Sequence, residues 1–297
     1  MGCINEITGH TKLTGLLGSP VAHSKSPLMH NESFRLLGLD YVYLCFDVKE
    51  DGLKTAFDGL KKINIAGFNC TMPDKTAICE FLDKLSPAAE MIGAVNTVVN
   101  DNGKFIGHNT DGIGYMQSVK DAGFDIIGDT MTLLGAGGAA SSIFVQAALD
   151  GVKNINIFSI KDKFWEKAEK MVDMVNQNTN CNAVLYELGN DDILNESISK
   201  SKILTNATSV GMAPNIDNCI IKDFSVLNEN LIVSDVIYNP METKLLRLAK
   251  EKGCPTFNGL YMLLYQGAEA FKIWTGQDMP VEEIKKKYFA PVQPCDK

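Results

Sequence analysis

A glycine-rich turn between a strand and a helix places the strongest constraint on the fold. TMTLL at 130–134 has the pattern of a buried strand, and SSIFVQAAL at 141–149 has helical spacing. Between them Gly135, Gly137 and Ala140 match the G-x-G-x-x-G/A fingerprint, whose small residues let a pyrophosphate approach a helix N-terminus. A turn that only ends a strand gives the same match. Because strand and helix flank the motif, we predict a dinucleotide site at Gly135, Ala136, Gly137, Gly138 and Ala139.

Strand-like and helix-like segments alternate along most of the chain, which favours an α/β fold. The remaining β-rich runs lie at 11–18, 41–48, 63–72, 154–159, 182–188, 201–208 and 230–238. Segments with helical spacing separate most of them, and the last run, 260–289, has the pattern of two helices without a strand.

This layout predicts two α/β domains. Residues 1–112 are expected to form an α/β substrate-binding domain, completed by C-terminal helices within 258–297. Residues 113–257 are expected to form a Rossmann-type, doubly wound dinucleotide-binding domain. The active site is then expected in the cleft between the two domains.

Composition excludes several kinds of partner. The formal net charge of −8 argues against broad attraction to nucleic acid or anionic membrane surfaces. The 8 cysteines are scattered without a C-x-x-C pair, so we expect reduced thiols and no metal site. No segment has the pattern of a secretory signal or a membrane span, and a cytoplasmic location follows by default. We expect a small-molecule ligand.

Polar residues cluster beside the apolar runs, and Ser24 and Ser26 form the first such group. Two residues apart in an extended loop, both hydroxyls can face one carboxylate. Alternatively, one of them is the N-cap of a helix with Pro27 at its first position.

Lys75 and Asp111 are the charged members of two further polar segments. Lys75 closes a polar run, two residues after a proline, although a solvated surface lysine is the simpler interpretation. Asp111 is equally an N-cap for the helix that is expected to begin near Gly112.

The polar segments also carry a family resemblance. SKSP, NCTMPDK, GAVNT, NTDG, GAGGAA, NATSVGM, VIYNP and YQGAEAF stand in the order found in shikimate dehydrogenases. The chain therefore resembles the shikimate and quinate dehydrogenase family over nearly its whole length. The resemblance implies NAD(P)-dependent, reversible oxidation of shikimate to 3-dehydroshikimate, a step of the chorismate pathway to aromatic amino acids. Quinate and 3-dehydroquinate are a second substrate pair to consider.

The resemblance also implies roles for individual residues. Lys75 and Asp111 would be the catalytic pair, and Ser24 and Ser26 would hold the substrate carboxylate. Ring hydroxyls would be bound by Asn69, Thr71, Asn96 and Gln266. Cofactor contacts would come from Tyr238, Gly259 and Met262, of which Tyr238 and Met262 border the nicotinamide.

The chemistry of the reaction agrees with this assignment. Reduction of a ring ketone needs a proton for the oxygen and stabilisation of the growing alkoxide, and a lysine ammonium provides both. Asp111 would orient that ammonium and accept a substrate hydroxyl. The motif around Lys75 departs from the family at Cys70, Met72 and Asp74, where we expect little harm.

Cofactor choice is predicted from the turn after the second Rossmann strand. Asp162 stands about 20 residues beyond the fingerprint, where a carboxylate accepts hydrogen bonds from ribose and repels the 2'-phosphate of NADP. Many family members carry Asn-Arg-Thr where this chain has Ser159, Ile160 and Lys161. Lys161 and Lys163 favour the opposite choice, and Asp162 is alternatively a helix N-cap. We expect NAD in preference to NADP.

A rival interpretation keeps the fold and drops the chemistry. The chain would then be a non-catalytic sensor that binds a shikimate-like ligand and a dinucleotide. Retention of both Lys75 and Asp111 argues against it. For the enzyme we expect a monomer or a homodimer.

Overall fold

The computed structural model describes residues 6–289, which form two compact units. Unit 1 contains the described residues up to Thr110 and from Gln266 onward, and unit 2 contains Asp111–Tyr265. The chain returns from unit 2 to unit 1 between Tyr265 and Gln266, inside one continuous helix. This boundary lies later in the chain than the expected one between residues 257 and 258. The outermost parts of the expected ranges, 1–5 and 290–297, lie outside the described residues, as do Cys3 and Cys295.

Unit 1 is built on a six-stranded mixed sheet of order β2-β1-β3-β5-β6-β4. Its strands are β1 Lys12–Gly18, β2 Tyr41–Asp47, β3 Gly67–Cys70, β4 Lys84–Leu85, β5 Thr97–Asp101 and β6 Lys104–His108. Its helices are α1 Ser26–Leu37, η1 Glu50–Gly52, α2 Leu53–Lys62, η2 Ala77–Phe81, α3 Pro87–Ile92, α10 Val281–Ile284 and η4 Lys285–Phe289. Helix α9, Leu260–Thr275, enters unit 1 at Gln266.

The two faces of this sheet bury different side chains. Leu17, Phe68 and Val98 point to one face and pack with Leu53 and Phe57 of α2. Residues one position away along the strands point to the opposite face, as the alternation of side chains requires. That second face carries polar groups, among them Asn69 and Thr97, which lie opposite each other on β3 and β5.

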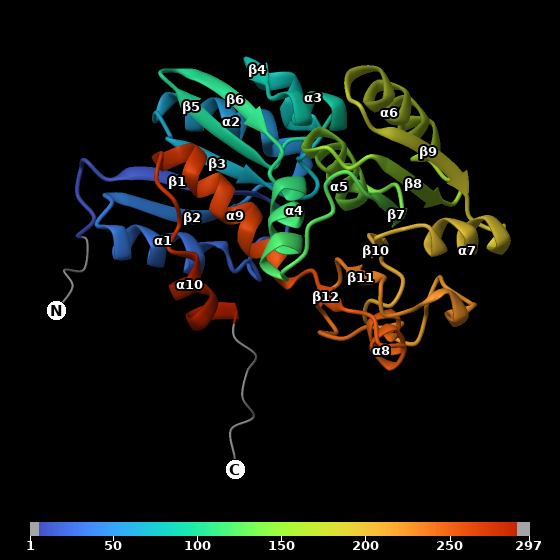
Figure 1. Cartoon of the computed structure of the whole chain (residues 1–297). Coiled ribbons are helices and arrows are strands. Elements are labelled where there is room, and N and C mark those ends of the chain that lie inside the picture. Colours follow the sequence, from blue (N-terminus) through green and yellow to red (C-terminus); the bar gives the residue numbers. More distant parts are fainter. Residues whose placement is uncertain (1–5, 290–297) are drawn as a thin grey trace, which may run out of the picture. The chain divides into compact units, whose positions relative to one another are not determined.

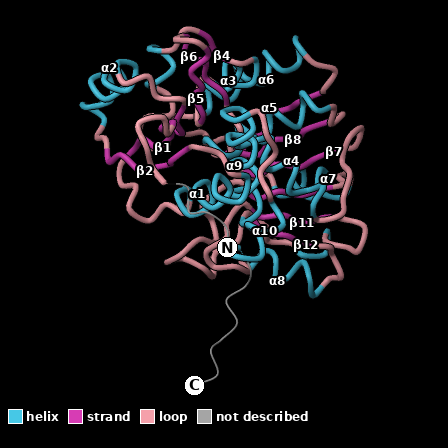
Figure 2. The backbone as a smooth tube through the Cα atoms, turned by 90° about the vertical axis from the view of Figure 1, so that its left-hand side faces the viewer, coloured by secondary structure: helices cyan, strands magenta, loops and turns pink. Residues whose placement is uncertain are grey.

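An antiparallel hairpin at one edge of the unit 1 sheet was not expected from the sequence. Strands β5 and β6 pair through a tight turn at Asn102 and Gly103, both with positive φ. Asn-Gly between two β-rich runs is a strong hairpin signal, because both residues tolerate this backbone conformation. With β4 they form the edge of the sheet seen in Figures 1 and 2.

Unit 2 is built on a six-stranded sheet, parallel throughout, of order β12-β11-β10-β7-β8-β9. Its strands are β7 Thr130–Leu134, β8 Asn154–Ser159, β9 Asn182–Glu187, β10 Ile203–Asn206, β11 Ile232–Asp235 and β12 Thr256–Asn258. Its helices are α4 Asp111–Asp121, α5 Gly138–Asp150, α6 Trp165–Asn178, α7 Asp191–Ser199, η3 Phe224–Val226 and α8 Lys244–Glu251. Counted from β7, this is the Rossmann strand order.

Helices cover both faces of the unit 2 sheet. Leu134 of β7 and Val233 of β11 share a core cluster with residues of α7 and α8. The neighbouring Leu133 lines the opposite face beside Phe144 of α5 and Met171 of α6. Figure 1 shows these two pairs of helices on either side of the strands. The predicted doubly wound α/β fold is confirmed. Within residues 6–289, every helix is too short or too polar to span a lipid bilayer.

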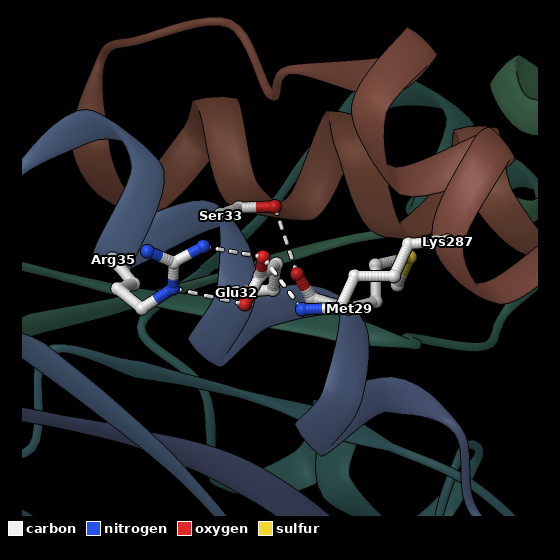
Figure 3. Close-up of polar contacts among 5 residues, drawn as sticks. All are labelled: Met29, Glu32, Ser33, Arg35 and Lys287. Atoms are coloured by element: carbon white, nitrogen blue, oxygen red, sulfur yellow. Dashed lines mark hydrogen bonds and ion pairs between the residues drawn. The ribbon is translucent and has the colours of Figure 1, made fainter. Parts of the chain in front are cut away.

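An ion cluster fastens the C-terminal turn η4 to helix α1 within unit 1. The carboxylate oxygen Oε1 of Glu32, on α1, forms ion pairs with the Arg35 guanidinium at 2.6 Å and with Lys287 Nζ at 2.8 Å (Figure 3). Only 11% of the Glu32 side chain is exposed. Hydrogen bonds from Arg35, which has the larger effect, and from Lys287 lower the pKa of Glu32 to about 2.

This depressed pKa sets the direction of a pH effect. A carboxylate whose folded pKa lies below its ordinary value stabilises the fold above the ordinary pKa and loses that contribution as pH falls. We expect Glu32→Gln to lower the free energy of unfolding by about 0.5–1 kcal/mol at pH 7. The deficit should shrink between pH 4.5 and pH 2, the interval between the ordinary and the lowered pKa. Denaturant titrations at several pH values measure it.

Glu196→Gln is the matched control, because Glu196 pairs with Lys200 while 64% of its side chain is exposed. It should change stability less at pH 7. An equal loss in both variants, or a Glu32→Gln deficit that is independent of pH, would contradict the assignment.

Candidate functional site

The fingerprint turn of unit 2 has the geometry expected for a dinucleotide loop. Gly135 follows β7 with φ +109°, and a Cβ there would lie 2.9 Å from Thr208 and 3.0 Å from the carbonyl oxygen of Ala207. Gly137 is the N-cap of α5, and a Cβ on Gly137 or Gly138 would meet no atom within 4 Å. The first turn of α5 contains no acidic residue. The loop therefore leaves room and a favourable helix end for a pyrophosphate.

The other expected cofactor residues also follow the carboxyl ends of parallel strands in unit 2. Asp162 comes after β8, Tyr238 after β11, and Gly259 directly after β12, with Met262 on the helix that follows. In open α/β sheets, ligands bind at this edge, near the point where the strand order reverses. A Cβ on Gly259 would overlap the carbonyl oxygen of Val236, so this backbone approach requires glycine.

A buried carboxylate holds the segment that carries Tyr238. Asp235 is 1% exposed, and it accepts hydrogen bonds from the Asn206 amide at 3.1 Å, the Thr243 hydroxyl at 2.7 Å and the backbone N–H of Ile237 at 3.0 Å. Burial raises the pKa of Asp235, and these hydrogen bonds oppose that rise. The bond to Ile237 fixes the backbone one residue before Tyr238.

The turn after β8 differs in part from the sequence expectation. Helix α6 begins at Trp165 with Phe164 as its N-cap, so the alternative of Asp162 as N-cap is wrong. Asp162 Oδ1 instead accepts the backbone N–H of Phe164 at 2.9 Å within the turn. Lys161 pairs with Glu187 at 3.2 Å, and Ile160 is 59% exposed.

A buried network of hydrogen bonds joins three of the expected ring-hydroxyl ligands in unit 1. Asn69 Nδ2 donates to the backbone oxygen of Asn96 at 3.1 Å and to Thr97 Oγ1 at 3.0 Å. Asn96 Nδ2 donates to Thr110 Oγ1 at 2.9 Å and toward Gln266 Oε1 at 3.5 Å. Thr110 Oγ1 donates to the backbone oxygen of Gln266 at 3.0 Å. The network connects segments that are far apart in the sequence. The fourth expected ring-hydroxyl ligand, Thr71, directly follows the end of β3.

The two serines lie at the start of α1: Ser24 is in the loop before the helix, and Ser26 is in its first turn. The N-cap of α1 is Lys25 without a side-chain cap bond, and Ser26 is already helical, so the capping alternative is wrong for both serines. Ser24 Oγ accepts the backbone N–H of Ser26 at 3.2 Å. Both side chains are partly exposed, as a binding role requires.

Lys75 and Asp111 are placed by separate units. Lys75 lies in the turn that follows β3, beyond the strand end at Cys70, and is half-buried. Asp111 is the first residue of α4 rather than the residue before it, so the alternative of an N-cap is wrong. It stands at a helix N-terminus, which favours a negative charge.

Three residues of the unit 1 network escaped the sequence analysis: Tyr43, Thr97 and Thr110. Thr97 and Thr110 each adjoin a predicted site residue, within GAVNT and HNTDG. Tyr43 alternates with apolar residues along β2, a pattern that is typical of core. Its hydroxyl nevertheless donates to Asn69 Oδ1 at 2.8 Å.

Known proteins resemble this chain over nearly its full length. A family model described as the shikimate dehydrogenase substrate binding domain matches residues 16–98. A second, described as the shikimate 5'-dehydrogenase C-terminal domain, matches residues 259–287. A shikimate dehydrogenase (NADP(+)) of Listeria innocua is 54% identical over 284 residues, 96% of this chain and 98% of that protein.

Solved structures give the same result. Shikimate 5-dehydrogenase from Listeria monocytogenes, in complex with shikimate and NAD, is 54% identical with a TM-score of 0.92, covering 94% of this chain and 97% of that one. Quinate dehydrogenase from Corynebacterium glutamicum, in complex with NAD, is 29% identical with a TM-score of 0.83, covering 95% and 99%.

Two glycines of the fingerprint turn allow the fold and the ligand to be tested separately. Gly135→Ala places a Cβ at positive φ against Ala207 and Thr208, and should cost about 1–2 kcal/mol of stability. Gly137→Ala meets open space, so its melting temperature should stay near wild type while dinucleotide affinity falls. Thermal melts and calorimetric titration with NAD and NADP measure both. Unchanged affinity in folded Gly137→Ala would contradict a pyrophosphate site at this turn.

Proposed function

This chain belongs to the shikimate dehydrogenase family and is an NAD(P)-dependent oxidoreductase that interconverts shikimate and 3-dehydroshikimate, and we propose that Lys75 and Asp111 move the proton in this reaction. The rival interpretation, a non-catalytic sensor, is set aside. The activity is tested directly by incubating the purified protein with shikimate and either NAD or NADP and following the absorbance of the reduced cofactor.

The observation that carries the substrate assignment is the buried network of unit 1. Asn69, Asn96 and Gln266 present amide groups on one hydrogen-bonded framework, which suits a ring that carries neighbouring hydroxyls. Ser24 and Ser26 provide hydroxyls at the start of α1, where a helix N-terminus favours a carboxylate. We assign these serines to the substrate carboxylate, and Asn69, Thr71, Asn96 and Gln266 to the ring hydroxyls.

The proton chemistry is assigned to side chains of this protein. When bound, the nicotinamide supplies or accepts the hydride. In the reducing direction the Lys75 ammonium donates a proton to the ketone oxygen and stabilises its developing negative charge. In the oxidising direction the neutral amine accepts the proton from the hydroxyl. Asp111 orients the Lys75 side chain and accepts a hydrogen bond from a substrate hydroxyl.

Quinate is a second candidate substrate, favoured by the likeness to a quinate dehydrogenase. It carries one additional tertiary hydroxyl, and a site must give that group a partner to accept it well. The same absorbance assay with quinate compares the two.

A monomeric or homodimeric state and a cytoplasmic location complete the proposal, and light scattering of the purified protein tests the oligomeric state.

Removal of either member of the catalytic pair should act mainly on turnover. Lys75→Ala and Asp111→Asn should each lower kcat about a hundredfold or more and change KM for shikimate far less, because both groups act in the transition state. Steady-state kinetics at saturating cofactor measure this.

Lys54 and Asp58 form a matched control, an exposed lysine–aspartate pair on α2 outside the site. Lys54→Ala and Asp58→Asn should retain wild-type kcat. If Lys75→Ala or Asp111→Asn also keeps near-full turnover, the pair is wrongly assigned.

We propose NAD as the preferred cofactor, with NADP as the weaker one. Ile160 gives no guanidinium for a 2'-phosphate, Lys161 is engaged with Glu187, and Asp162 adds a negative charge to the turn. The relatives named for NADP(+) favour the opposite choice, and Lys163 is the cation in the turn that remains to support it.

The preference is measured as the ratio of kcat/KM with NAD to kcat/KM with NADP. Asp162→Ala should move this ratio toward NADP by about fivefold, the effect of removing one screened like charge. Asp173→Ala, an exposed aspartate later on α6, should leave the ratio unchanged. A wild-type preference for NADP would overturn the proposal and direct attention to Lys163.

A further inference from the structure

Tyr43 contacts the hydrogen-bond network of unit 1 that contains Asn69, Asn96 and Gln266, although no assigned role explains its hydroxyl. Its side chain is fully buried, and Oη donates to Asn69 Oδ1 at 2.8 Å. A buried hydroxyl costs free energy unless it is hydrogen-bonded, so a phenylalanine would serve equally well if only packing mattered. The partner of this hydroxyl is one of the residues proposed to bind the substrate ring.

The direction of the hydrogen bonds around Asn69 follows from one acceptor. The backbone oxygen of Asn96 can only accept, so the amide nitrogen of Asn69 must face it, at 3.1 Å. The second amide hydrogen goes to Thr97 Oγ1 at 3.0 Å. Asn69 Oδ1 therefore faces Tyr43, and the phenol must be the donor. Among residues 6–289, Tyr43 is the one donor to this oxygen, which leaves its second lone pair for a ligand.

Tyr43 is itself held on both its ring and its backbone. The imidazole of His30 stacks on the ring at 4.5 Å with 18° between the planes, and burial lowers the pKa of His30 to about 3, so this ring is neutral. Asn31 makes two bonds to the backbone of Tyr43, accepting its N–H at 2.8 Å and donating to its carbonyl at 2.9 Å.

These contacts connect Tyr43 with the serine segment. His30 and Asn31 belong to α1, the helix that begins at Ser26. Burial raises the pKa of Tyr43 well above its ordinary value, and the nearby Ser26 hydroxyl opposes that rise. One residue thus links the start of α1 to the amide of Asn69.

We propose that Tyr43 is a positioning residue of the substrate site: its hydroxyl locks the Asn69 amide so that the remaining Oδ1 lone pair accepts a ring hydroxyl. Its anchored ring also sets the spacing between the Ser24–Ser26 segment and Asn69. This rests on the proposed function, since it concerns the same site. Asn69 accordingly acts toward the substrate as an acceptor and recognises a hydroxyl donor.

Tyr43→Phe tests the proposal, because it removes the hydroxyl and keeps the ring. We expect KM for shikimate to rise about five- to tenfold, with a smaller change in kcat and an unchanged KM for the cofactor. Tyr115→Phe is the matched control, since Tyr115 is also fully buried and its hydroxyl contacts Thr205 and Ser234 in unit 2. Tyr115→Phe should lower the melting temperature without raising KM for shikimate.

A double-mutant cycle tests whether Tyr43 acts through Asn69. Asn69→Ala should raise KM for shikimate, and adding Tyr43→Phe should then raise it less than about twofold further. Fully additive effects, or a Tyr43→Phe variant that loses thermal stability while keeping its KM, would overturn the inference. If Tyr43→Phe does not fold, Thr97→Val removes the hydrogen bond that Thr97 Oγ1 accepts from the Asn69 amide and should raise KM likewise; an unchanged KM overturns the proposal. Wild-type protein that fails to oxidise shikimate contradicts the proposed function, whereas active wild type with unaffected variants contradicts this inference alone.

Discussion

Unit 1 depends on the hydrogen bonds of a single buried residue, Asn96. Its backbone oxygen accepts from Cys70 N at 2.9 Å and from the Asn69 amide, while its backbone N–H donates to His108 at 3.0 Å. Its side-chain oxygen accepts from Thr110 N at 2.8 Å. Asn96 thereby joins the ends of β3 and β6 and the segment leading to α4. In a site of low dielectric such a network is stable only when nearly every member is satisfied. The same groups that hold the strands together therefore present the amides that we assign to the substrate.

The sequence predicted the fold well where a single segment carries its own signal. The fingerprint between β7 and α5, and strands with a clear β-rich run such as β8, were placed within a few residues. The hairpin of β5 and β6 was not predicted, because its strands are short and follow a polar segment, although Asn102–Gly103 carries a hairpin turn signal. The division inside α9 has no local signal, because the helix is continuous across it.

The candidate site was predicted mainly through motifs, and the motifs name residues one at a time. They did not reveal which side chains share hydrogen bonds, since those depend on strand register: Asn69 meets Thr97 because β3 and β5 pair there. The alternative of a helix N-cap is wrong at Ser24, Ser26, Asp111 and Asp162. Each of these helices begins within a few residues of the expected start, and a small shift is enough to move a residue out of the N-cap position. Tyr43 was missed because an aromatic residue on a strand is typical of core.

The discontinuous build of unit 1 has a consequence for biosynthesis. Phe271 and Trp274, from α9, pack against Phe34 and His30, and the Trp274 indole donates to the carbonyl of Val98 at 2.9 Å. The N-terminal part of unit 1, up to Thr110, thus lacks part of its own core until the residues from Gln266 onward have been made. Unit 2, whose residues run without interruption, is available to fold first. The sheet of unit 1 can therefore complete its core only after α9 has been made, and until then it lacks the aromatic side chains that α9 supplies.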